Sequence, residues 1–519
     1  MSAYAGFEPP ESFNIADYFL FDRLREGRGE RVAIRCADVR WTYAQVAQLA
    51  RRYAHGLRAH GVEQEHRVIV ALPDGPDFAA ALFGALAMGA VGVMVNPHLS
   101  ADEVAYFLAY TRARAAFVHA SCAESFREAA AQGGHHLKAL FALGGEVAGA
   151  VSFDPLRYSD APMEAAVHRD DAALWLFSGG TTGRPKAVVQ THTSFANTTE
   201  CYAKRALGYR EDDVTVSVPK LFFGYATGSN LFFPFAVGAT SVLFPERATP
   251  EELFRQIERH RPTILVNVPT MVSQMLAHDP GAKRDLSSLR FATSAGEALP
   301  VSLHERWDAA YGVDLLDGLG TAEMWHIFIT NRPGRVRRGT LGTVVEGFEV
   351  LLCGDDGRDV GQGEAGALWV KGNSRAIGYW QQHAKGTKQF LGEWYVSGDL
   401  LARDADGNYT YCGRNDDMLK IKGKWFAPKE VEDCLSRHPA VGECVVVGVT
   451  AADGLVRPVA FVRATDSTGD LESLLKVYAA AQLASYKVPE RFVITTEALP
   501  RTHLGKVDRG RLRRELEGA

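Results

Sequence analysis

The chain has 519 residues, more than one ordinary hydrophobic core accommodates, so two or more domains are expected. Hydrophobic residues make up 46% of the chain and charged residues 23%, which is typical of a globular protein. The net charge of −5 gives no electrostatic basis for nucleic acid or an anionic membrane as the main partner.

Cysteine usage and the first residues bear on the cellular compartment. The seven cysteines are scattered, odd in number and without a CxxC pair, which favours reduced thiols over a disulfide framework or a zinc site. The N-terminal residues include acids and prolines where a secretory signal needs a basic and then an apolar run. These features predict a cytoplasmic protein.

The first clear helix signal follows Thr42. Residues 42–45 have the spacing of a capping box, and apolar residues then recur at helical intervals as far as Gly61. A short apolar run at residues 68–72 predicts a buried strand directly after this helix.

Residues 78–95 contain no charge and have the length at which a membrane helix becomes conceivable. Several glycines and alanines make the segment weakly hydrophobic for that length. We therefore interpret it as a buried helix to about Met88, a turn at Gly89 and a buried strand at residues 91–95, and we expect no membrane span.

The same alternation returns near residue 250. Thr249, Pro250 and Glu252 combine a helix cap, a proline at the first helical position and an acid that could close a capping box. Pro262 ends the predicted helix, and residues 264–268 form the next strand. Strand and helix alternating in this way predict an α/β fold with parallel sheets covered by helices.

The pattern changes after about residue 340. Short strands such as residues 367–370 are separated by turns rich in Gly and Asp, which predicts a β-rich subdomain at 340–415. A polar run at 414–417 marks a further boundary. We expect a large N-terminal domain at 1–415 and a small, mobile α+β domain at 416–519.

The strongest chemical signal lies at residues 178–186, directly after an apolar strand at 172–177. Glycines allow backbone N–H groups to turn toward one point, and threonine hydroxyls and two cations add to them, which suits the oxygens of a triphosphate. No Gly-Lys-Ser/Thr follows at the spacing of the common P-loop. The predicted ATP-binding residues here are Ser178, Gly179, Gly180, Thr181, Thr182, Gly183 and Lys186.

This run resembles the phosphate loop of the acyl-adenylate-forming superfamily, which comprises acyl-CoA synthetases, adenylation domains of peptide synthetases and firefly-type luciferases. Four further segments follow in the superfamily's order along nearly the whole chain. Residues 318–324 resemble its adenine and magnesium motif, 395–399 with 413–414 its ribose-binding pair, 416–423 its hinge, and 500–506 its C-terminal lysine loop.

The resemblance implies roles in the attack of a carboxylate on the α-phosphate of ATP. Two anions approach each other in this step, so the site must supply cations and orient both groups. Glu323 matches the catalytic acid that binds Mg²⁺, a hard ion that takes oxygen ligands. Asp399 and Arg414 match the ribose contacts. Gly318, Gly320 and Thr321 match the nucleotide-binding segment.

The resemblance also implies roles for the C-terminal part. Lys506 matches the catalytic lysine that bridges the substrate carboxylate and a ribose oxygen during adenylation. Asp416 matches the hinge residue, and Gly423 the coenzyme A tunnel. One departure bears on the chemistry: the superfamily has threonine directly before the acid, whereas this chain has Ala322 there, so the α-phosphate contact is lacking or is made by Thr321.

Three segments, residues 220–230, 293–297 and 323–328, resemble the benzoate-CoA ligase branch in particular. The small residues among them would leave room for a flat ring, and an aromatic residue with an imidazole would bound it. By that resemblance the acid pocket consists of Gly224, Tyr225, Ala295, Gly296, His326 and Ile327, with Gly320 also small at this place.

The acceptor and the exact acid follow less directly. An amino-acid substrate would require a carboxylate for its ammonium, and residues 222–230 contain none. An amino-acid substrate is therefore disfavoured, and because no carrier domain is expected after Ala519, coenzyme A is favoured over a carrier protein. Hydroxyls of Thr227 and Ser229 could serve a ring substituent, so 2-aminobenzoate (anthranilate) or a hydroxybenzoate is as open as benzoate itself.

Three alternatives stay open: activation of a short or medium-chain fatty acid, a luciferase-like oxygenase, and a non-catalytic ligand-binding relative. The last is disfavoured because Lys506 and Glu323 are both present. The sequence gives no oligomeric state, and a homodimer is compatible with it.

Overall fold

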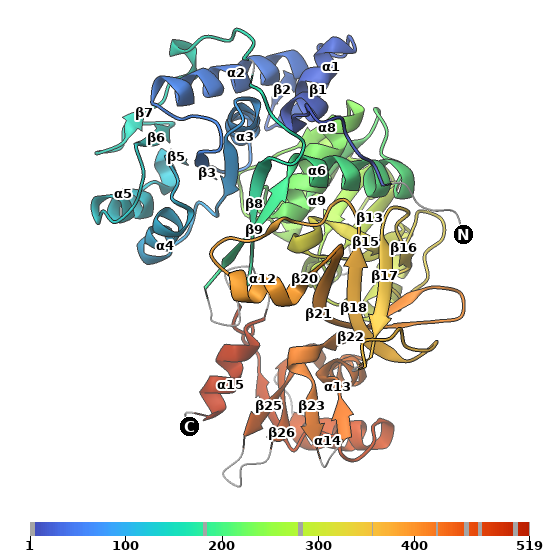
Figure 1. Ribbon diagram of the computed structural model, residues 1–519. Coiled ribbons are helices and arrows are strands. Elements are labelled where there is room, and N and C mark those ends of the chain that lie inside the picture. Colours follow the sequence, from blue (N-terminus) through green and yellow to red (C-terminus); the bar gives the residue numbers. More distant parts are fainter. Residues whose placement is uncertain are drawn as a thin grey trace.

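The structure, a computed structural model, describes residues 6–163, 165–179, 184–278, 284–354, 356–421, 424–450, 456–465, 470–501 and 507–517 (Figure 1). None of its described helices is long and apolar enough to cross a membrane. The uncharged segment at 78–95 forms a buried helix, a turn at Gly89 with φ of 75°, and a buried strand, as predicted.

An eight-stranded sheet forms the first layer of the N-terminal part, with strand order β19-β9-β8-β4-β3-β5-β6-β7. Its strands from β8 through β4 and β3 to β7 pair in parallel, while β9 and β19 add antiparallel pairs at one edge. The strands are β3 (Arg67–Ala71), β4 (Val91–Met94), β5 (Ala115–His119), β6 (Ala139–Leu143), β7 (Val151–Ser152), β8 (Ala172–Ser178), β9 (Lys186–Thr191) and β19 (Gly378–Tyr379).

Helices cover both faces of this sheet, and the alternating side chains of β3 show which helices pack on each face. Val68 and Val70 pack with helices α2 and α3, whereas Ile69 and Ala71 pack with α4 and α5 on the opposite face. Figure 1 shows these two helix pairs on either side of the strands. The helices are α2 (Tyr43–Ala59), α3 (Pro76–Ala87), α4 (Ala101–Thr111) and α5 (Glu124–Ala131).

A nine-stranded sheet follows, with strand order β16-β15-β14-β13-β12-β10-β11-β1-β2. Its central strands from β14 to β1 are parallel, and β2, β15 and β16 add antiparallel edges. The strands are β1 (Val32–Cys36), β2 (Val39–Thr42), β10 (Val214–Ser217), β11 (Thr240–Val242), β12 (Ile264–Asn267), β13 (Phe291–Ser294), β14 (Leu315–Gly320), β15 (Ile327–Thr330) and β16 (Thr343–Val344).

Helices α9 (Pro250–His260), α10 (Pro269–Ala277) and α11 (Val301–Tyr311) pack on one face of the second sheet. The other face contacts a long helical stretch made of α7 (Gly224–Thr227), the π-helix η5 (Gly228–Phe232) and α8 (Phe233–Val237). Shorter helical segments include η1 (Asp17–Phe21), α1 (Asp22–Arg25), α6 (His192–Thr198), η4 (Thr199–Ala206) and η6 (Ala322–Met324).

The caps predicted from the sequence are partly confirmed. Thr42 and Gln45 form the predicted capping box at the start of α2. At α9 the Thr249 side chain accepts the N–H of Glu252 as predicted. The predicted contact from the Glu252 carboxylate back to the Thr249 N–H is wrong. The Glu252 carboxylate pairs instead with Arg255 on the next turn, because a guanidinium is a stronger partner than a backbone N–H.

A β-rich unit comes next, as the change of pattern after residue 340 predicted. It is an antiparallel sheet of β17 (Glu349–Cys353), β18 (Ala365–Lys371), β20 (Phe390–Leu391), β21 (Trp394–Arg403) and β22 (Tyr409–Arg414). Helix α12 (His383–Gln389) precedes β20 and lies beside it (Figure 1), and it contacts both β19 and β21.

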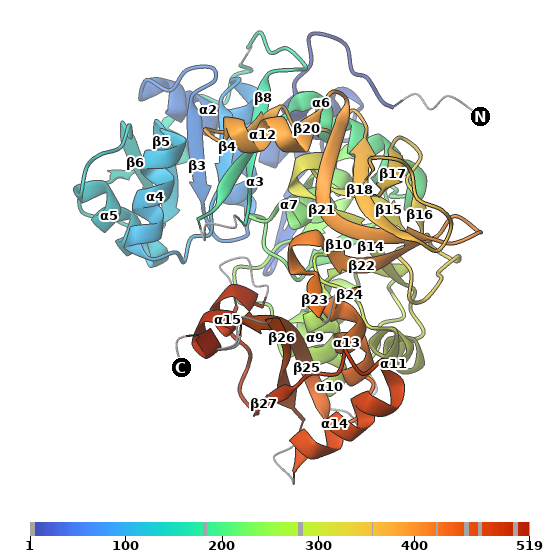
Figure 2. The same cartoon turned by 60° about the horizontal axis from the view of Figure 1, so that its bottom comes forward.

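The C-terminal elements group together at one end of the molecule in both views (Figure 2). They are the hairpin β23 (Leu419–Ile421) and β24 (Lys424–Phe426), the sheet β25 (Val441–Thr450), β26 (Val456–Ala464) and β27 (Arg491–Thr495), and the helices α13 (Pro428–Leu435), α14 (Leu471–Gln482) and α15 (Arg509–Glu517). They have hydrophobic clusters of their own, which include Val431, Val446 and Leu475. The domain limits at 415 and 416 stay a prediction.

Candidate functional site

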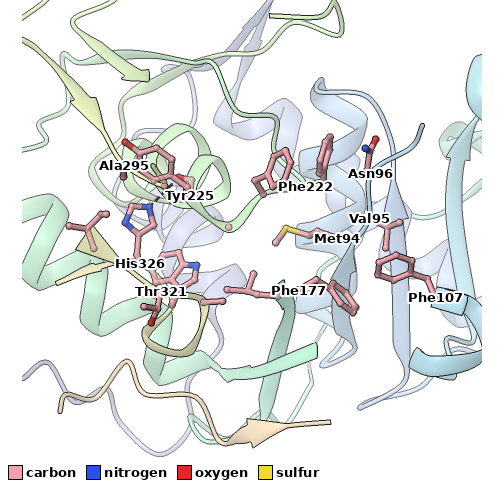
Figure 3. Close-up of a pocket in the computed structure, with 18 of the residues that line it drawn as sticks. Met94, Val95, Asn96, Phe107, Phe177, Phe222, Tyr225, Ala295, Thr321 and His326 are labelled. Carbon is pink, nitrogen blue, oxygen red and sulfur yellow. Dashed lines mark hydrogen bonds between the residues drawn. The ribbon is translucent and has the colours of Figure 1, made fainter. Parts of the chain in front are cut away.

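A pocket with a volume of about 190 Å³ lies where strands of both large sheets end (Figure 3). Residues after β4 and at the end of β8 line one side, and residues after β13 and at the end of β14 line the other. The first turn of α7 closes it. Open α/β sheets bind ligands at the carboxyl ends of their parallel strands, so this position is the expected one for a binding site.

The pocket brings together all six residues assigned to the acid pocket from the sequence. They are Gly224, Tyr225, Ala295, Gly296, His326 and Ile327. The Tyr225 hydroxyl lies 2.6 Å from Thr293 Oγ1, which directs the phenol ring along the end of β13. The structure thus groups these residues around one cavity, and their contact with a substrate stays a prediction.

Two of the glycines at the pocket are required by the backbone rather than by space for a ring. A Cβ on Gly320 would lie 2.4 Å from the carbonyl oxygen of His326, and Gly296 has φ of +88°. A Cβ on Gly224 would instead meet only the Leu176 side chain, at 3.3 Å. The expectation that each small residue makes room for the acid therefore applies to Gly224, but not to Gly320 or Gly296.

His326 is held as a neutral imidazole at the pocket wall. Its Nε2 lies 3.1 Å from the Tyr225 carbonyl oxygen and 3.3 Å from Ser229 Oγ. Because a carbonyl oxygen only accepts hydrogen bonds, Nε2 carries the proton and Nδ1 is an acceptor. Burial lowers the pKa of His326 to about 3. Nδ1 and the neighbouring Trp325 Nε1 are buried without a hydrogen-bond partner among the described residues.

The expected contact of Thr227 and Ser229 with a ring substituent is not supported. The buried Thr227 hydroxyl donates to the Leu221 carbonyl oxygen at 2.5 Å, and Ser229 Oγ contacts His326 Nε2. Neither residue lines the pocket. Both hydroxyls instead fix the parts of the helix and loop that carry Phe222 to Tyr225, because buried hydroxyls form hydrogen bonds with the nearest polar groups.

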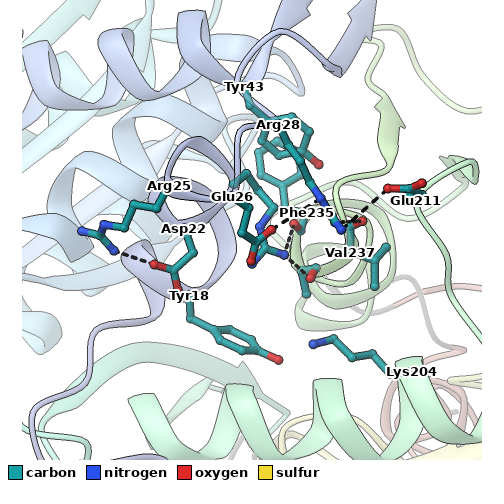
Figure 4. Close-up of polar contacts among 12 residues, drawn as sticks. Tyr18, Asp22, Arg25, Glu26, Arg28, Tyr43, Lys204, Glu211, Phe235 and Val237 are labelled. Atoms are coloured by element: carbon teal, nitrogen blue, oxygen red, sulfur yellow. Dashed lines mark hydrogen bonds and ion pairs between the residues drawn. The ribbon is translucent and has the colours of Figure 1, made fainter.

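The helix that begins at the pocket is fixed at its far end by two arginines, Arg23 and Arg28, of which Figure 4 labels Arg28 together with Phe235 and Val237. Arg23 donates to the carbonyl oxygens of Phe235 and Ala236, and Arg28 donates to that of Val237 at 2.9 Å. Carbonyls at a helix C-terminus lack partners within the helix, and the helix dipole favours cations there. The segment at 23–28 therefore anchors the stretch from α7 to α8, whose first residues are Gly224 and Tyr225.

A buried ionic cluster adjoins the pocket, because Glu323 directly follows the pocket residue Ala322 in the sequence. Lys186 Nζ and the Tyr379 hydroxyl lie 3.2 Å and 2.8 Å from the same oxygen of Glu323, and the Lys186 ammonium lies 3.8 Å from the centre of the Tyr379 ring. Burial lowers the pKa of Lys186 and raises that of Tyr379. The sequence predicted Lys186 and Glu323 for the nucleotide site but missed Tyr379.

The predicted phosphate-binding segment begins at the end of β8 and ends at the start of β9. Ser178 at the end of β8 pairs in register with Lys186 at the start of β9. Helix α4 supports the chain directly before β9, since the Tyr106 hydroxyl donates to the Pro185 carbonyl oxygen at 2.6 Å. Ser178 Oγ is buried without a hydrogen-bond partner among the described residues, and Gly179 is exposed.

Several predicted site residues lie outside the described residues. They are Gly180, Thr181, Thr182, Gly183, Gly423 and Lys506. Asp416 falls in the short 3₁₀ turn Asn415–Asp417, and its side chain is not described. The roles expected for these residues stay predictions.

The predicted ribose contacts face each other across two strands. Asp399 on β21 is paired in register with Arg414 on β22, and the closest approach of their side chains is 3.8 Å. The buried Asp399 carboxylate also accepts the Ser397 hydroxyl at 2.5 Å. A carboxylate fixed in this way can accept two hydroxyls of a sugar.

The motif around Glu323 is shaped by Thr321. Its Oγ1 accepts the Met324 N–H at 3.3 Å at the start of η6, and Thr321 lines the pocket. Ala322 also lines the pocket, and its carbonyl oxygen accepts an N–H of Gln190 at 2.6 Å. Because the Thr321 hydroxyl proton is not used in this cap, it can be donated into the pocket. Gly318 lies where β14 approaches β15, and a Cβ there would lie 3.0 Å from the Ile329 carbonyl oxygen.

Mg²⁺ fits the acidic side chain at this place. Among the described residues there is no group of three or more His, Cys, Asp or Glu side chains that could hold a metal. A protein that supplies one carboxylate, here Glu323, suits an ion that takes its other ligands from phosphates and water, as Mg²⁺ does. Such a site would form only together with a nucleotide.

Sequence reasoning missed the second side of the pocket. Met94, Asn96, Phe107 and Phe177 line it. A signal for them was present, since Met94 and Phe177 lie near the carboxyl ends of two buried strands that pair in parallel in this sheet.

Comparison with known proteins agrees with this geometry. The family model described as AMP-binding enzyme matches residues 21–380, and that described as AMP-binding enzyme C-terminal domain matches residues 430–506. The chain is 39% identical to a 4-hydroxybenzoate-CoA/benzoate-CoA ligase of Rhodopseudomonas palustris, over 97% of this chain and 94% of the relative. It is 39% identical to a benzoate-CoA ligase of Thauera aromatica, over 97% and 96%.

Among solved structures, an anthranilate CoA ligase in complex with anthranoyl-AMP superimposes with a TM-score of 0.91. It is 37% identical to this chain, and the alignment covers 98% of both chains. The resemblance inferred from the five sequence motifs is thereby confirmed, and so is the α/β architecture. The chain belongs to the family of AMP-binding enzymes.

Proposed function

We propose that this protein is an ATP-dependent aryl acid:CoA ligase that acts on benzoate or a small ring-substituted benzoate such as anthranilate. The pocket carries the proposal. An apolar cavity of about 150 Å³ accepts benzene, and this one has about 190 Å³ beside a neutral imidazole and an aromatic ring. The names of the relatives agree with an aromatic acid.

In the first half-reaction a carboxylate oxygen of the acid attacks the α-phosphorus of ATP. The bond from this phosphorus to the bridging oxygen breaks, and its electron pair leaves with pyrophosphate, so no proton is transferred. Lys186 and the hydroxyl of Thr321 lie on the phosphate side of the pocket, where they can bind the anions and hold them in line. Mg²⁺, held by Glu323 and the phosphates, would neutralise charge on the pyrophosphate.

Asp399 and Arg414 would fix the ribose, and Lys506 would contact the reacting carboxylate. In the second half-reaction the thiol of coenzyme A, as thiolate, attacks the acyl carbon, and AMP leaves with the electron pair of the broken C–O bond. We assign Asp416 to the hinge and Gly423 to the coenzyme A tunnel on the resemblance. The seven free thiols support a reducing compartment, and we propose the cytoplasm.

The test is AMP release across benzoates, phenylacetates and short to medium-chain fatty acids, each with and without coenzyme A. We expect benzoate or an ortho- or para-substituted benzoate to be preferred, with turnover that depends on coenzyme A. A preference for a fatty acid over every benzoate would reject the substrate class. Sustained turnover with oxygen in the absence of a thiol would reject coenzyme A as the acceptor.

A further inference from the structure

Helix α12 directs a second lysine toward the ionic cluster around Glu323. Strand β19 lies beside β9 with Tyr379 opposite Val188, which places the start of α12 next to Lys186. Gln389 reaches the Tyr379 hydroxyl from α12 at 2.7 Å. Lys385 lies one helical turn before Gln389 and therefore on the same face of the helix.

Lys385 and Lys186 are close enough to repel each other. Lys186 Nζ lies 3.8 Å from the centre of the Tyr379 ring, whose hydroxyl Gln389 contacts from the helix face that also carries Lys385, and the two ammonium groups repel each other. Lys385 itself is half-buried. Two ammonium groups therefore meet beside one carboxylate, Glu323, which leaves an excess of positive charge at the edge of the cluster.

Such an excess is unfavourable in a partly buried place unless an anion occupies it. The predicted phosphate-binding segment ends at Lys186, where β9 begins, so the two ammonium groups lie at the end of that segment. An anion with several oxygens can contact both of them, because each is a compact donor of three N–H bonds.

We propose that Lys385 binds the β- and γ-phosphates of ATP and, after the first half-reaction, the pyrophosphate leaving group. This inference rests on the proposed function, since it concerns the phosphate side of the same site. Lys385 would stabilise the charge that develops on the bridging oxygen when its bond to the α-phosphorus breaks. It has no part in the second half-reaction, from which pyrophosphate is absent.

The experiment compares Lys385→Met with Lys388→Met, an exposed lysine on the same short helix. Binding of inorganic pyrophosphate with Mg²⁺ is measured by calorimetry, and KM for pyrophosphate is measured in acid-dependent ATP–pyrophosphate exchange. We expect both constants to rise about tenfold in Lys385→Met, the scale of one charge-assisted hydrogen bond at a half-buried site. Lys388→Met and Lys385→Arg should stay within about twofold of the wild type.

Thioester formation from supplied acyl-AMP and coenzyme A separates this role from a structural one. It should be unchanged in Lys385→Met, whereas a distorted α12 would slow both half-reactions. Unchanged pyrophosphate constants, or equal losses in both half-reactions, would overturn the inference. Because calorimetry needs no acid, it tests Lys385 even if the wild-type protein activates no benzoate, a result that would reject the proposed function alone.

Discussion

His326 sets the polarity of the pocket through one nitrogen. Its Nε2 is occupied by the Tyr225 carbonyl oxygen, so Nδ1 is the ring nitrogen left without a hydrogen bond among the described residues. With a pKa of about 3, the ring stays neutral throughout the neutral pH range. A neutral acceptor suits an aromatic amine, whereas an imidazolium would offer only donors.

The substitution His326→Ala should therefore change the ratio of kcat/KM for anthranilate and benzoate. If the ortho amine donates to Nδ1, the loss of that contact should lower the ratio about tenfold to a hundredfold, since an unpaired polar contact costs about 1–3 kcal/mol. The wild-type ratio should not vary between pH 6 and pH 8 on account of His326. An unchanged ratio in the variant would remove His326 from this role.

Gly224 and Gly320 provide a matched pair of substitutions at the same pocket. Gly224→Leu should abolish the use of benzoate with little effect on ATP affinity, because its side chain would enter the space beside Leu176. Gly320→Ala should lower the melting temperature and the activity with every acid, because its Cβ would overlap the backbone at His326. Thermal unfolding and KM for ATP distinguish the two. A stable, fully active Gly320→Ala would contradict the packing argument.

At the scale of elements, the stretch from α7 to α8 depends on contacts at both ends. Its first turn forms the pocket wall, and its last carbonyls accept the arginines of the N-terminal segment. Arg23 is buried, so its loss would leave the carbonyls of Phe235 and Ala236 without these donors. A shift at this end would be transmitted to Gly224 along a rigid helix.

Arg23→Met should lower the free energy of unfolding by about 1–3 kcal/mol and raise KM for the acid more than KM for ATP. The control is Arg25→Met, because Arg25 forms exposed ion pairs with Asp17 and Asp22, and such pairs contribute little. Urea unfolding and substrate titrations give both values. Equal effects of the two substitutions would show that the buried contacts of Arg23 neither stabilise the fold nor affect binding of the acid.

Local signals made several elements predictable from the sequence. The capping box at Thr42 and the proline at Pro250 fixed the starts of α2 and α9, since both act within a few residues. The contacts of Arg23 and Tyr379 were not predictable. Arg23 reaches a carbonyl oxygen 212 residues away, and Tyr379 reaches Glu323 only because β19 adds to the edge of β9.

In the candidate site, too, local features were predictable from the sequence and tertiary contacts were not. Motifs identified six residues that line one cavity in the structure, because each motif is a short run with fixed local geometry. The sequence could not show at which positions the backbone requires glycine and at which glycine leaves space in the pocket. That distinction depends on how closely β14 approaches the chain at His326, a tertiary contact that the spacing of residues does not encode.

At the scale of the whole molecule, the two half-reactions place different demands on the C-terminal part. On the family resemblance, Lys506 serves adenylation and leaves the site when the domain beyond Asp416 turns. Lys506→Ala should slow acyl-AMP formation by about two to three orders of magnitude, as expected for the loss of one charge stabiliser. Thioester formation from supplied acyl-AMP should persist. Rapid-quench measurement of each step tests this, and an equal loss in both would contradict it.

The strand order of the nine-stranded sheet has a consequence for synthesis of the chain. The hairpin β1–β2 leaves the ribosome early, yet its parallel partner β11 begins only at Thr240. At about 5–20 residues per second, β1 waits roughly 10–40 s for that partner. During this interval the edge of β1 that pairs with β11 is unpaired, and the side chains of Arg23 and Arg28 lack their native carbonyl partners, so the N-terminal segment reaches its final packing only after residue 240 has been made.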